Sequence, residues 1–199
     1  MRKIIVATGN EHKMQELRQM LDGLEVELIS MKEAGITADI VENGTTFEEN
    51  AKIKAKTISK LTGEIVIADD SGLEIDYLGG EPGIYSARYM GEDTSYEVKN
   101  QNLIDRVKDA VGEERSARFV CAMVAVLPDG KVLTTRGTIE GVIAKEPVGE
   151  NGFGYDPIVY VPEYGMTTAQ MSSEQKNAIS HRGKAMRALK EALKKELEG

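Results

Sequence analysis

The stretch IVIADDSGLEI, from Ile65 to Ile75, ends an apolar run on two adjacent aspartates, Asp69 and Asp70. Its β-branched and small residues predict a buried strand, and an alternating segment follows the break at Ser71-Gly72. Two neighbouring carboxylates at the end of a buried strand cost free energy through desolvation and mutual repulsion. Two interpretations stay open at this point. The aspartates are ordinary strand-end and turn residues, or they hold a cation and a reacting water at the mouth of a cleft.

The segments around this strand alternate between strand and helix patterns. Pro128-Asp129-Gly130 is a turn signal between two strands, which predicts an antiparallel hairpin. We therefore expect an α/β or α+β fold with a mixed sheet. The expected strands are Ile4–Ala7, Val26–Ser30, Ala117–Leu127, Lys131–Ile143 and Pro157–Val161, and the expected helices are His12–Leu21, Thr45–Thr62, Thr94–Val111 and one at the C-terminus.

Two of the expected helices carry capping signals. Thr46 and Glu49 form a predicted capping box before a stripe of apolar residues, and Gly63 is placed to end that helix. Thr94 and Glu97 form a second predicted box. The residues expected to pack inward from these two helices are Phe47, Ala51, Ala55 and Ile58 in the first and Ile104, Val107 and Val111 in the second.

The composition excludes several classes of protein. With 199 residues, 41% hydrophobic and 29% charged, the chain is a globular protein with a substantial core. A net charge of −8 argues against a nucleic-acid partner. The one cysteine, Cys121, excludes an internal disulfide and lies in an apolar run too short to span a membrane, which needs ~20 apolar residues. Without a signal peptide pattern, a cytoplasmic protein with no membrane partner is expected.

Several basic residues lie where an anion would bind. The segment ATGNEHK, Ala7 to Lys13, joins a strand to a helix, where backbone N–H groups can cradle a phosphate, although a plain strand–turn–helix has the same pattern. Lys52, Lys56 and Lys60 form an exposed row at helical spacing. Lys54 instead follows the apolar face, so it either extends to water or meets an anion.

Acidic and aromatic residues add two further candidates. Glu42 has no capping role, so Glu42 and an aspartate of the Asp69-Asp70 pair can share Mg²⁺ if the loop folds over the strand end. Phe153, between two glycines, suits stacking on a nucleobase. Lys176, His181 and Arg182 gather near the start of the last helix and favour an anion or carbonyl site.

Five segments in order, TGNEHK, TFEENAKIKA, ADDSGLEID, GFGYDPI and KNAISHR, make the chain resemble the inosine triphosphate pyrophosphatase family. The resemblance covers nearly the whole chain, with no departure in the motif cores. It implies one domain, residues 1–199, with an α/β fold of an elongated mixed sheet in two lobes around a nucleotide cleft, and a homodimer. It also implies Mg²⁺-dependent hydrolysis of inosine, deoxyinosine and xanthosine triphosphates to the monophosphate and pyrophosphate.

The resemblance also implies a role for each matching residue. Asp70 is the expected base, with Asp69 beside it, and Glu42 and Asp70 hold the metal. The residues implied for the triphosphate are Thr8, Gly9, Asn10, Lys13, Lys54 and Ser71, with Glu11 and His12 in the same motif. Those implied for the base and the phosphate-side pocket are Phe153, Gly154, Tyr155, Asp156, Lys176, His181 and Arg182.

Strand geometry and donor chemistry sharpen two of these expectations. Successive strand residues point to opposite faces, so Asp69 and Asp70 are expected to do different jobs. Lys and Arg only donate hydrogen bonds, so contacts from Lys176 and Arg182 suit a purine 6-oxo group and not the 6-amino group of adenine. If xanthine is accepted and guanine is not, the C2 edge is expected to meet a donor, or at least no free acceptor, and a backbone N–H of Phe153–Asp156 is the candidate donor.

Two other functions remain open. A nucleotide-binding sensor would explain the lysines and Phe153, but not the three carboxylates. A pyrophosphatase acting on pyrimidine or methylated nucleotides is the second, against which the group Lys176, His181 and Arg182 argues through the resemblance. The loop Gly83–Tyr89 carries tyrosines and an arginine, which are enriched at interfaces, and it either contributes to the dimer or lines the cleft.

Overall fold

The computed structural model describes all residues, 1–199, and contains a seven-stranded mixed sheet with five α-helices. The strand order is β2-β1-β3-β4-β5-β6-β7. β1 pairs in parallel with β2 and β3, whereas β6 pairs antiparallel with β5 and β7. The strands are β1 Arg2–Val6, β2 Val26–Ser30, β3 Ile65–Ile75, β4 Ser116–Val126, β5 Val132–Ile143, β6 Val159–Val161 and β7 Met166–Thr167, and the helices are α1 Glu11–Met20, α2 Phe47–Thr62, α3 Tyr96–Arg106, α4 Ser173–Ile179 and α5 His181–Glu198. The expected α/β class is confirmed, and no helix is long and apolar enough to cross a membrane.

The chain forms two compact units, each with its own core. Unit 1 comprises Met1–Asp70, Cys121–Gly137 and Arg182–Gly199, and unit 2 comprises Ser71–Val120 and Thr138–His181. The strands β3, β4 and β5 contribute residues to both units.

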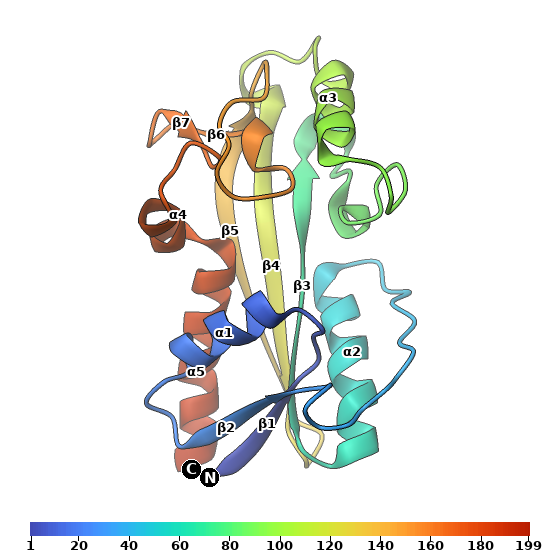
Figure 1. Ribbon diagram of the computed structural model, residues 1–199, viewed down its shortest axis with the longest axis vertical. Coiled ribbons are helices and arrows are strands. Elements are labelled where there is room, and N and C mark those ends of the chain that lie inside the picture. The colour runs from blue at the N-terminus through green and yellow to red at the C-terminus, as the bar shows by residue number, and fades with distance from the viewer. The chain divides into compact units, whose positions relative to one another are not determined.

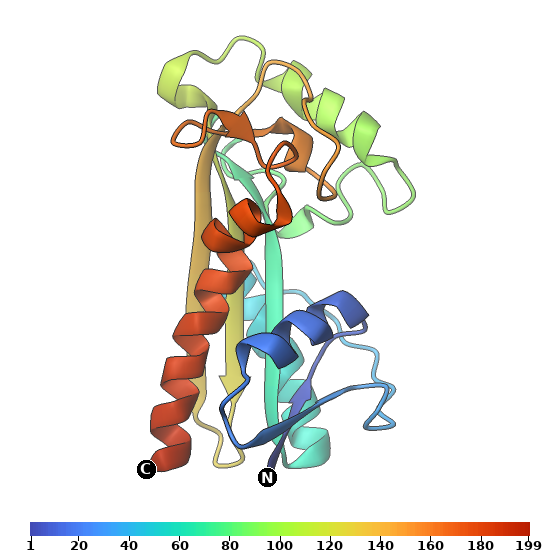
Figure 2. The same cartoon turned by 60° about the vertical axis from the view of Figure 1, so that its left-hand side comes forward.

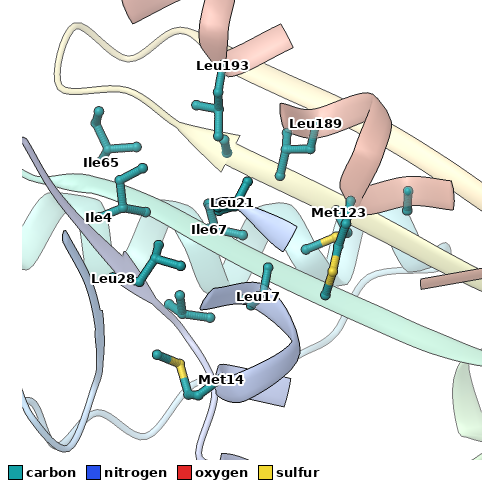
Figure 3. Close-up of a cluster of buried hydrophobic side chains, with 14 of the residues drawn as sticks. Ile4, Met14, Leu17, Leu21, Leu28, Ile65, Ile67, Met123, Leu189 and Leu193 are labelled. Atoms are coloured by element: carbon teal, nitrogen blue, oxygen red, sulfur yellow. The ribbon is translucent and has the colours of Figure 1, made fainter. Parts of the chain in front are cut away.

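In unit 1, helices cover both faces of the sheet (Figure 1). Helices α1 and α5 pack on one face, and Figure 2 shows α5 running along the strands of the hairpin. Alternate residues of each strand reach this core, which Figure 3 shows in detail. Its labelled members are Ile4, Met14, Leu17, Leu21, Leu28, Ile65, Ile67, Met123, Leu189 and Leu193. The intervening strand residues, such as Val66 and Ala68, pack against Ala51, Ala55 and Ile58 of α2 on the other face.

In unit 2, the residues of β3, β4 and β5 divide between an apolar and a charged face. Leu73 of β3 and Phe119 of β4 enter a core with Leu103 of α3. The neighbouring residues on the strands form a charged network instead. In this network Arg118 contacts Asp76 at 2.9 Å, Glu140 at 3.1 Å and Glu74 at 3.6 Å.

Most expected elements are confirmed, and the differences lie at their ends. β2 matches the prediction, and the hairpin of β4 and β5 forms around the predicted turn, where Gly130 N–H donates to Leu127 O. Gly63 caps α2 with φ +71°. The strand expected at Pro157–Val161 begins only at Val159, because Pro157 lies in a 3₁₀ turn over 156–158. The C-terminal helix is divided at Ser180 into α4 and α5.

The predicted helix Thr94–Val111 is wrong at both ends. α3 is capped by Ser95, whose hydroxyl accepts from Val98 N–H, so the box of Thr94 and Glu97 does not form. The helix stops at Arg106, where Arg115 donates to the Val107 carbonyl. Val111 therefore lies beyond the helix and is 75% exposed.

The capping box predicted for α2 is extended by one residue, Thr45. The Thr46 hydroxyl accepts from Glu49 N–H, as expected. The Glu49 carboxylate accepts mainly from the N–H and hydroxyl of Thr45, and the predicted interaction with the Thr46 N–H is the weaker one.

Candidate active site

The predicted site residues fall into two groups, and each group belongs to one unit. Unit 1 holds the strand–helix junction with Lys13, the loop carboxylate Glu42, the helix lysine Lys54 and both aspartates. Unit 2 holds the aromatic loop. The members in unit 1 are Thr8, Gly9, Asn10, Glu11, His12, Lys13, Glu42, Lys54, Asp69, Asp70 and Arg182, and those in unit 2 are Ser71, Phe153, Gly154, Tyr155, Asp156, Lys176 and His181.

The strand–helix junction is organised by its own side chains. Asn10 caps α1, with its Oδ1 accepting from the N–H groups of His12 and Lys13 at 3.0 and 3.3 Å. Asn10 N–H in turn donates to the Thr8 hydroxyl at 3.1 Å. Because Asn10 already uses two N–H groups of the first turn, an anion at this junction would have to replace the Asn10 side chain or bind the remaining donors.

Asp69 is buried among positive charges on the α1 and α5 face of the sheet. Lys13 Nζ of α1 lies 2.7 Å from Asp69 Oδ2, and Arg182 of α5 is close enough to act on the same carboxylate. Burial by itself would raise the pKa of Asp69, but the charges of Lys13, Lys54 and Arg182 outweigh it and lower that pKa. Asp69 is thus held in its ionised form by these cations.

Asp70 lies among different groups, mainly of α2. Asn50 of α2 hydrogen-bonds to its carboxylate, yet Asp70 Oδ2 is buried without a hydrogen-bond partner. Burial raises the pKa of Asp70 to about 6, the Glu42 charge adds to the rise, and Lys54 opposes it. A carboxylate with this pKa can hold or release a proton near neutral pH. The expected division of the two aspartates between opposite surroundings is confirmed.

Lys54 contacts an anionic group, the carboxylate of Glu42. Of the two alternatives for this lysine, extension to water or contact with an anion, the structure shows the second. Its Nζ lies 3.2 Å from Glu42 Oε1 and donates to the Asp69 carbonyl oxygen at 2.5 Å. Lys54 therefore links the loop that carries Glu42 to the end of the buried strand. The row Lys52, Lys56 and Lys60 is exposed, as predicted.

The remaining basic residue of unit 1, Arg182, is paired at the start of α5. Its Nη1 lies 2.8 Å from Glu16 Oε2 of α1, while its Nε is buried without a hydrogen-bond partner. Around the two aspartates the unit thus gathers three cations, Lys13, Lys54 and Arg182, and the two additional carboxylates of Glu16 and Glu42.

In unit 2, the buried Asp156 side chain binds the backbone of the aromatic loop, Gly152–Asp156. It is buried, and its Oδ2 accepts from Phe153 N–H at 2.9 Å and from Lys176 Nζ at 2.5 Å. Its Oδ1 accepts from the Thr168 hydroxyl at 2.8 Å. Gly152 has φ +73°, and a Cβ there would lie 2.1 Å from Asp156 Oδ2, so only glycine fits.

The Phe153 side chain is exposed, as the sequence predicts, with 72% of its surface accessible. Lys176 Nζ lies 5.0 Å from the centre of its ring. His181 stacks on Phe119 at 5.3 Å between ring centres. The N–H groups of Phe153 and Asp156 are both used within the loop, so of the predicted backbone donors to a base only those of Gly154 and Tyr155 remain.

Two residues that the sequence analysis did not select support these groups. Asn50 is buried, donates to Asp70 and accepts from Gly44 N–H at 2.8 Å. Thr168 is buried against Asp156. The signal for Asn50 is an asparagine on the otherwise apolar buried face of α2, whereas nothing in the local sequence distinguishes Thr168.

Comparison with known proteins decides the family. A sequence profile of the Ham1 family matches residues 4–192. The chain belongs to the Ham1 family. It is 48% identical to a dITP/XTP pyrophosphatase of Bacillus licheniformis over 97% of this chain and 98% of the relative, and 50% identical to one of Thermus thermophilus over 96% and 92%.

Solved structures of the Ham1 family agree with this assignment. The HAM1 protein of Coxiella burnetii superimposes with a TM-score of 0.92, at 41% identity, over 98% of this chain and 100% of that one. The family resemblance drawn from the five sequence segments is therefore confirmed. The roles of individual residues stay predictions.

Proposed function

We propose that this Ham1 family member hydrolyses the triphosphates of hypoxanthine and xanthine nucleosides to the monophosphate and pyrophosphate. Relatives that this chain matches over nearly their full length are named dITP/XTP pyrophosphatases. The single observation in this chain that supports hydrolysis best is Asp70, a mostly buried carboxylate with a pKa of about 6 and one unpartnered oxygen, beside Glu42 and Lys54. Binding alone would not need such a group.

The residues of unit 1 fit a triphosphate with Mg²⁺. Carboxylate oxygens are the ligands that Mg²⁺ prefers, and it usually keeps several waters and substrate oxygens as well. Glu42 and the unpartnered oxygen of Asp70 supply two such ligands, and no larger group of His, Cys, Asp and Glu residues is arranged to hold a metal. Bound Mg²⁺ would supply positive charge to the phosphate oxygens.

The chain's own residues account for the other parts of the reaction. Ionised Asp70 accepts a hydrogen bond from the attacking water and takes its proton as the bond to the α-phosphorus forms. Lys13 and Lys54 each carry three N–H donors, of which the contacts to Asp69 and Glu42 use only some, so the others can stabilise the departing pyrophosphate. Asp69 holds Lys13 in place without acting on the water.

The residues of unit 2 are assigned to the base. The exposed Phe153 ring offers a flat surface for stacking, which is worth ~1–3 kcal/mol for nucleobases. The sequence predicts both Lys176 and Arg182 as donors to the 6-oxo group of the purine. Lys176 is tied to Asp156 in unit 2, and Arg182 to Glu16 in unit 1, so each would use its remaining donors.

The test is a panel of ITP, XTP, GTP and ATP on one preparation, with and without Mg²⁺, and with identification of the products. ITP and XTP should give similar kcat/KM and exceed ATP by up to the ~10⁴–10⁵ by which hydrogen-bonded sites reject a wrong analogue. GTP should also be poor, because its 2-amino group would meet a donor. Release of inorganic phosphate in place of pyrophosphate, binding without hydrolysis, or a preference for pyrimidine nucleotides would contradict the proposal.

A further inference from the structure

The first two turns of α3 contact the aromatic loop Gly152–Asp156 at two neighbouring positions. Asn100 Nδ2 donates to the Gly154 carbonyl oxygen at 3.1 Å. Tyr96, four residues earlier and so on the same helix face, lies edge-on to Tyr155 at 5.1 Å between ring centres. A Cβ on Gly154 would lie 3.6 Å from the Tyr96 ring, so the loop backbone passes directly along this face of the helix.

A buried lysine connects the same helix face to a second loop. Lys99 is 1% exposed, donates to the Ala87 carbonyl oxygen at 3.0 Å, and places its Nζ 4.7 Å from the centre of the Tyr96 ring. The Tyr155 hydroxyl donates to the adjacent carbonyl of Ser86. The helix, the 86–87 segment and the aromatic loop thus form a closed set of contacts within unit 2.

The buried Asn100 amide lowers the stability of the folded protein compared with an apolar residue at the same place. Asn100 is 3% exposed, and its Oδ1 is buried with no hydrogen-bond partner. An unpaired buried acceptor destabilises the folded state, whereas an apolar residue of similar size would not. The position therefore favours a function for the Nδ2 donor over a contribution to stability, because such local conflicts gather at functional sites.

The backbone is what sets the position of Phe153. The Phe153 ring is exposed and has only Lys176 within cation–π distance. The Phe153 N–H donates to the Asp156 carboxylate, and the Phe153 carbonyl accepts from Asp156 N–H at 3.2 Å. The carbonyl of the next residue, Gly154, is held by Asn100. These contacts therefore restrict the backbone that carries the Phe153 ring.

We propose that Asn100 is a positioning residue for the base: its amide fixes the Gly154 carbonyl and thereby holds the Phe153 ring ready to stack. The assignment of the base to this loop rests on the proposed function, but the effect of Asn100 on the order of the loop does not. Tyr96 and Lys99 complete the support by fixing the helix face against the loop.

The first test measures the loop directly by amide hydrogen exchange in Asn100→Leu, with Asn102→Leu as the matched control. Asn102 lies on the same helix and accepts from the Tyr89 hydroxyl, without contact to the aromatic loop. Exchange in a peptide covering residues 150–157 should be about five- to tenfold faster in Asn100→Leu, the factor that corresponds to one hydrogen bond, and unchanged in Asn102→Leu. Unchanged exchange in Asn100→Leu would overturn the proposal.

The second test is the kinetic consequence with ITP. Asn100→Leu should raise KM about tenfold while kcat changes less than threefold, because Asp70, Glu42, Lys13 and Lys54 all lie in unit 1. A lower kcat with unchanged KM, or equal effects in both variants, would assign Asn100 a purely structural role. Asn100→Ala is a second variant with a smaller side chain, for the case that leucine does not fit at this position, and it provides the same two readouts. If the wild-type protein does not hydrolyse ITP, the proposed function fails, and hydrogen exchange still decides whether Asn100 orders the loop.

Discussion

At the scale of single residues, Asp69 and Asp70 show how one position along a strand changes the chemistry of a carboxylate. Asp69 meets Lys13 on the side of α1, and Asp70 meets Asn50 and Glu42 on the side of α2. The pKa is lowered at the first and raised to about 6 at the second. Removal of the charge at these two positions should therefore change the free energy of unfolding in opposite directions.

Asp70→Asn should make the metal-free protein more stable while removing its activity. The folded protein binds the Asp70 proton more tightly than the unfolded chain, so the wild-type free energy of unfolding should rise as pH falls from about 7 to 4. The variant should lose this pH dependence and gain on the order of 2 kcal/mol at pH 7.5. Its ITP turnover should fall by ~10²–10⁴.

Denaturant unfolding between pH 4 and 8 measures the effect, with Asp69→Asn as control. That variant should be destabilised at neutral pH, because Lys13 loses its partner. An Asp70→Asn variant with near-normal turnover, or with lower stability at pH 7.5, would show that the role given to Asp70 is wrong.

Lys13→Met should destabilise the protein, since it leaves the buried Asp69 carboxylate with less compensation. The loss should be smaller than the ~3–5 kcal/mol typical of breaking a buried pair, because Lys54 and Arg182 still act on Asp69. Lys52→Met, in the exposed row, should change stability by less than about 0.5 kcal/mol. Urea unfolding of both variants and of Lys13→Met/Asp69→Asn measures this, and no recovery in the double variant would argue against the pairing.

At the scale of elements, the loop Gly152–Asp156 depends on backbone geometry as much as on side chains. Gly152→Ala places a methyl group onto Asp156 Oδ2 and adds strain at φ +73°. The contacts of Asp156 to Phe153 and Lys176 should break, with a rise in KM for ITP and a lower thermal midpoint.

Gly79→Ala is the matched control for this loop variant. Its φ of +64° is similar, but a Cβ there meets nothing within 4 Å. It should cost only the backbone strain, about 1 kcal/mol, and leave KM unchanged. Equal thermal midpoints and equal KM values in the two variants would contradict the role given to Asp156 in organising the loop.

At the scale of the whole molecule, each unit has its own hydrophobic core, and the family resemblance predicts a homodimer. The loop Gly83–Tyr89 remains one candidate for the contact, since Tyr85 is exposed and carries Arg88 over its ring at 4.8 Å. Light scattering at micromolar concentration should give the mass of two chains. A mass of one chain would contradict the dimer, and Tyr85→Ser/Arg88→Ser should lower the mass only if this loop forms the contact.

Much of the fold follows from sequence patterns with a local physical cause. The turn signal Pro128-Asp129-Gly130 predicted the hairpin, and the glycine after α2 predicted the end of that helix, because turns and left-handed caps are properties of a few adjacent residues. Order and spacing of the five motif segments identified the family. Helix ends that depend on competing caps, such as Ser95 against Thr94, were not predictable at this level.

The site itself was decided by contacts between residues far apart in the chain. The sequence determined that Asp69 and Asp70 face opposite ways and that Lys54 lies on an apolar helix face. Only the tertiary structure decided that Lys13 pairs with Asp69, that Glu42 and Asn50 reach Asp70, and that Asn100 supports Gly154. The physical reason is that desolvation and charge pairing, which set these pKa values and bonds, depend on the packing of whole elements and not on local residue order.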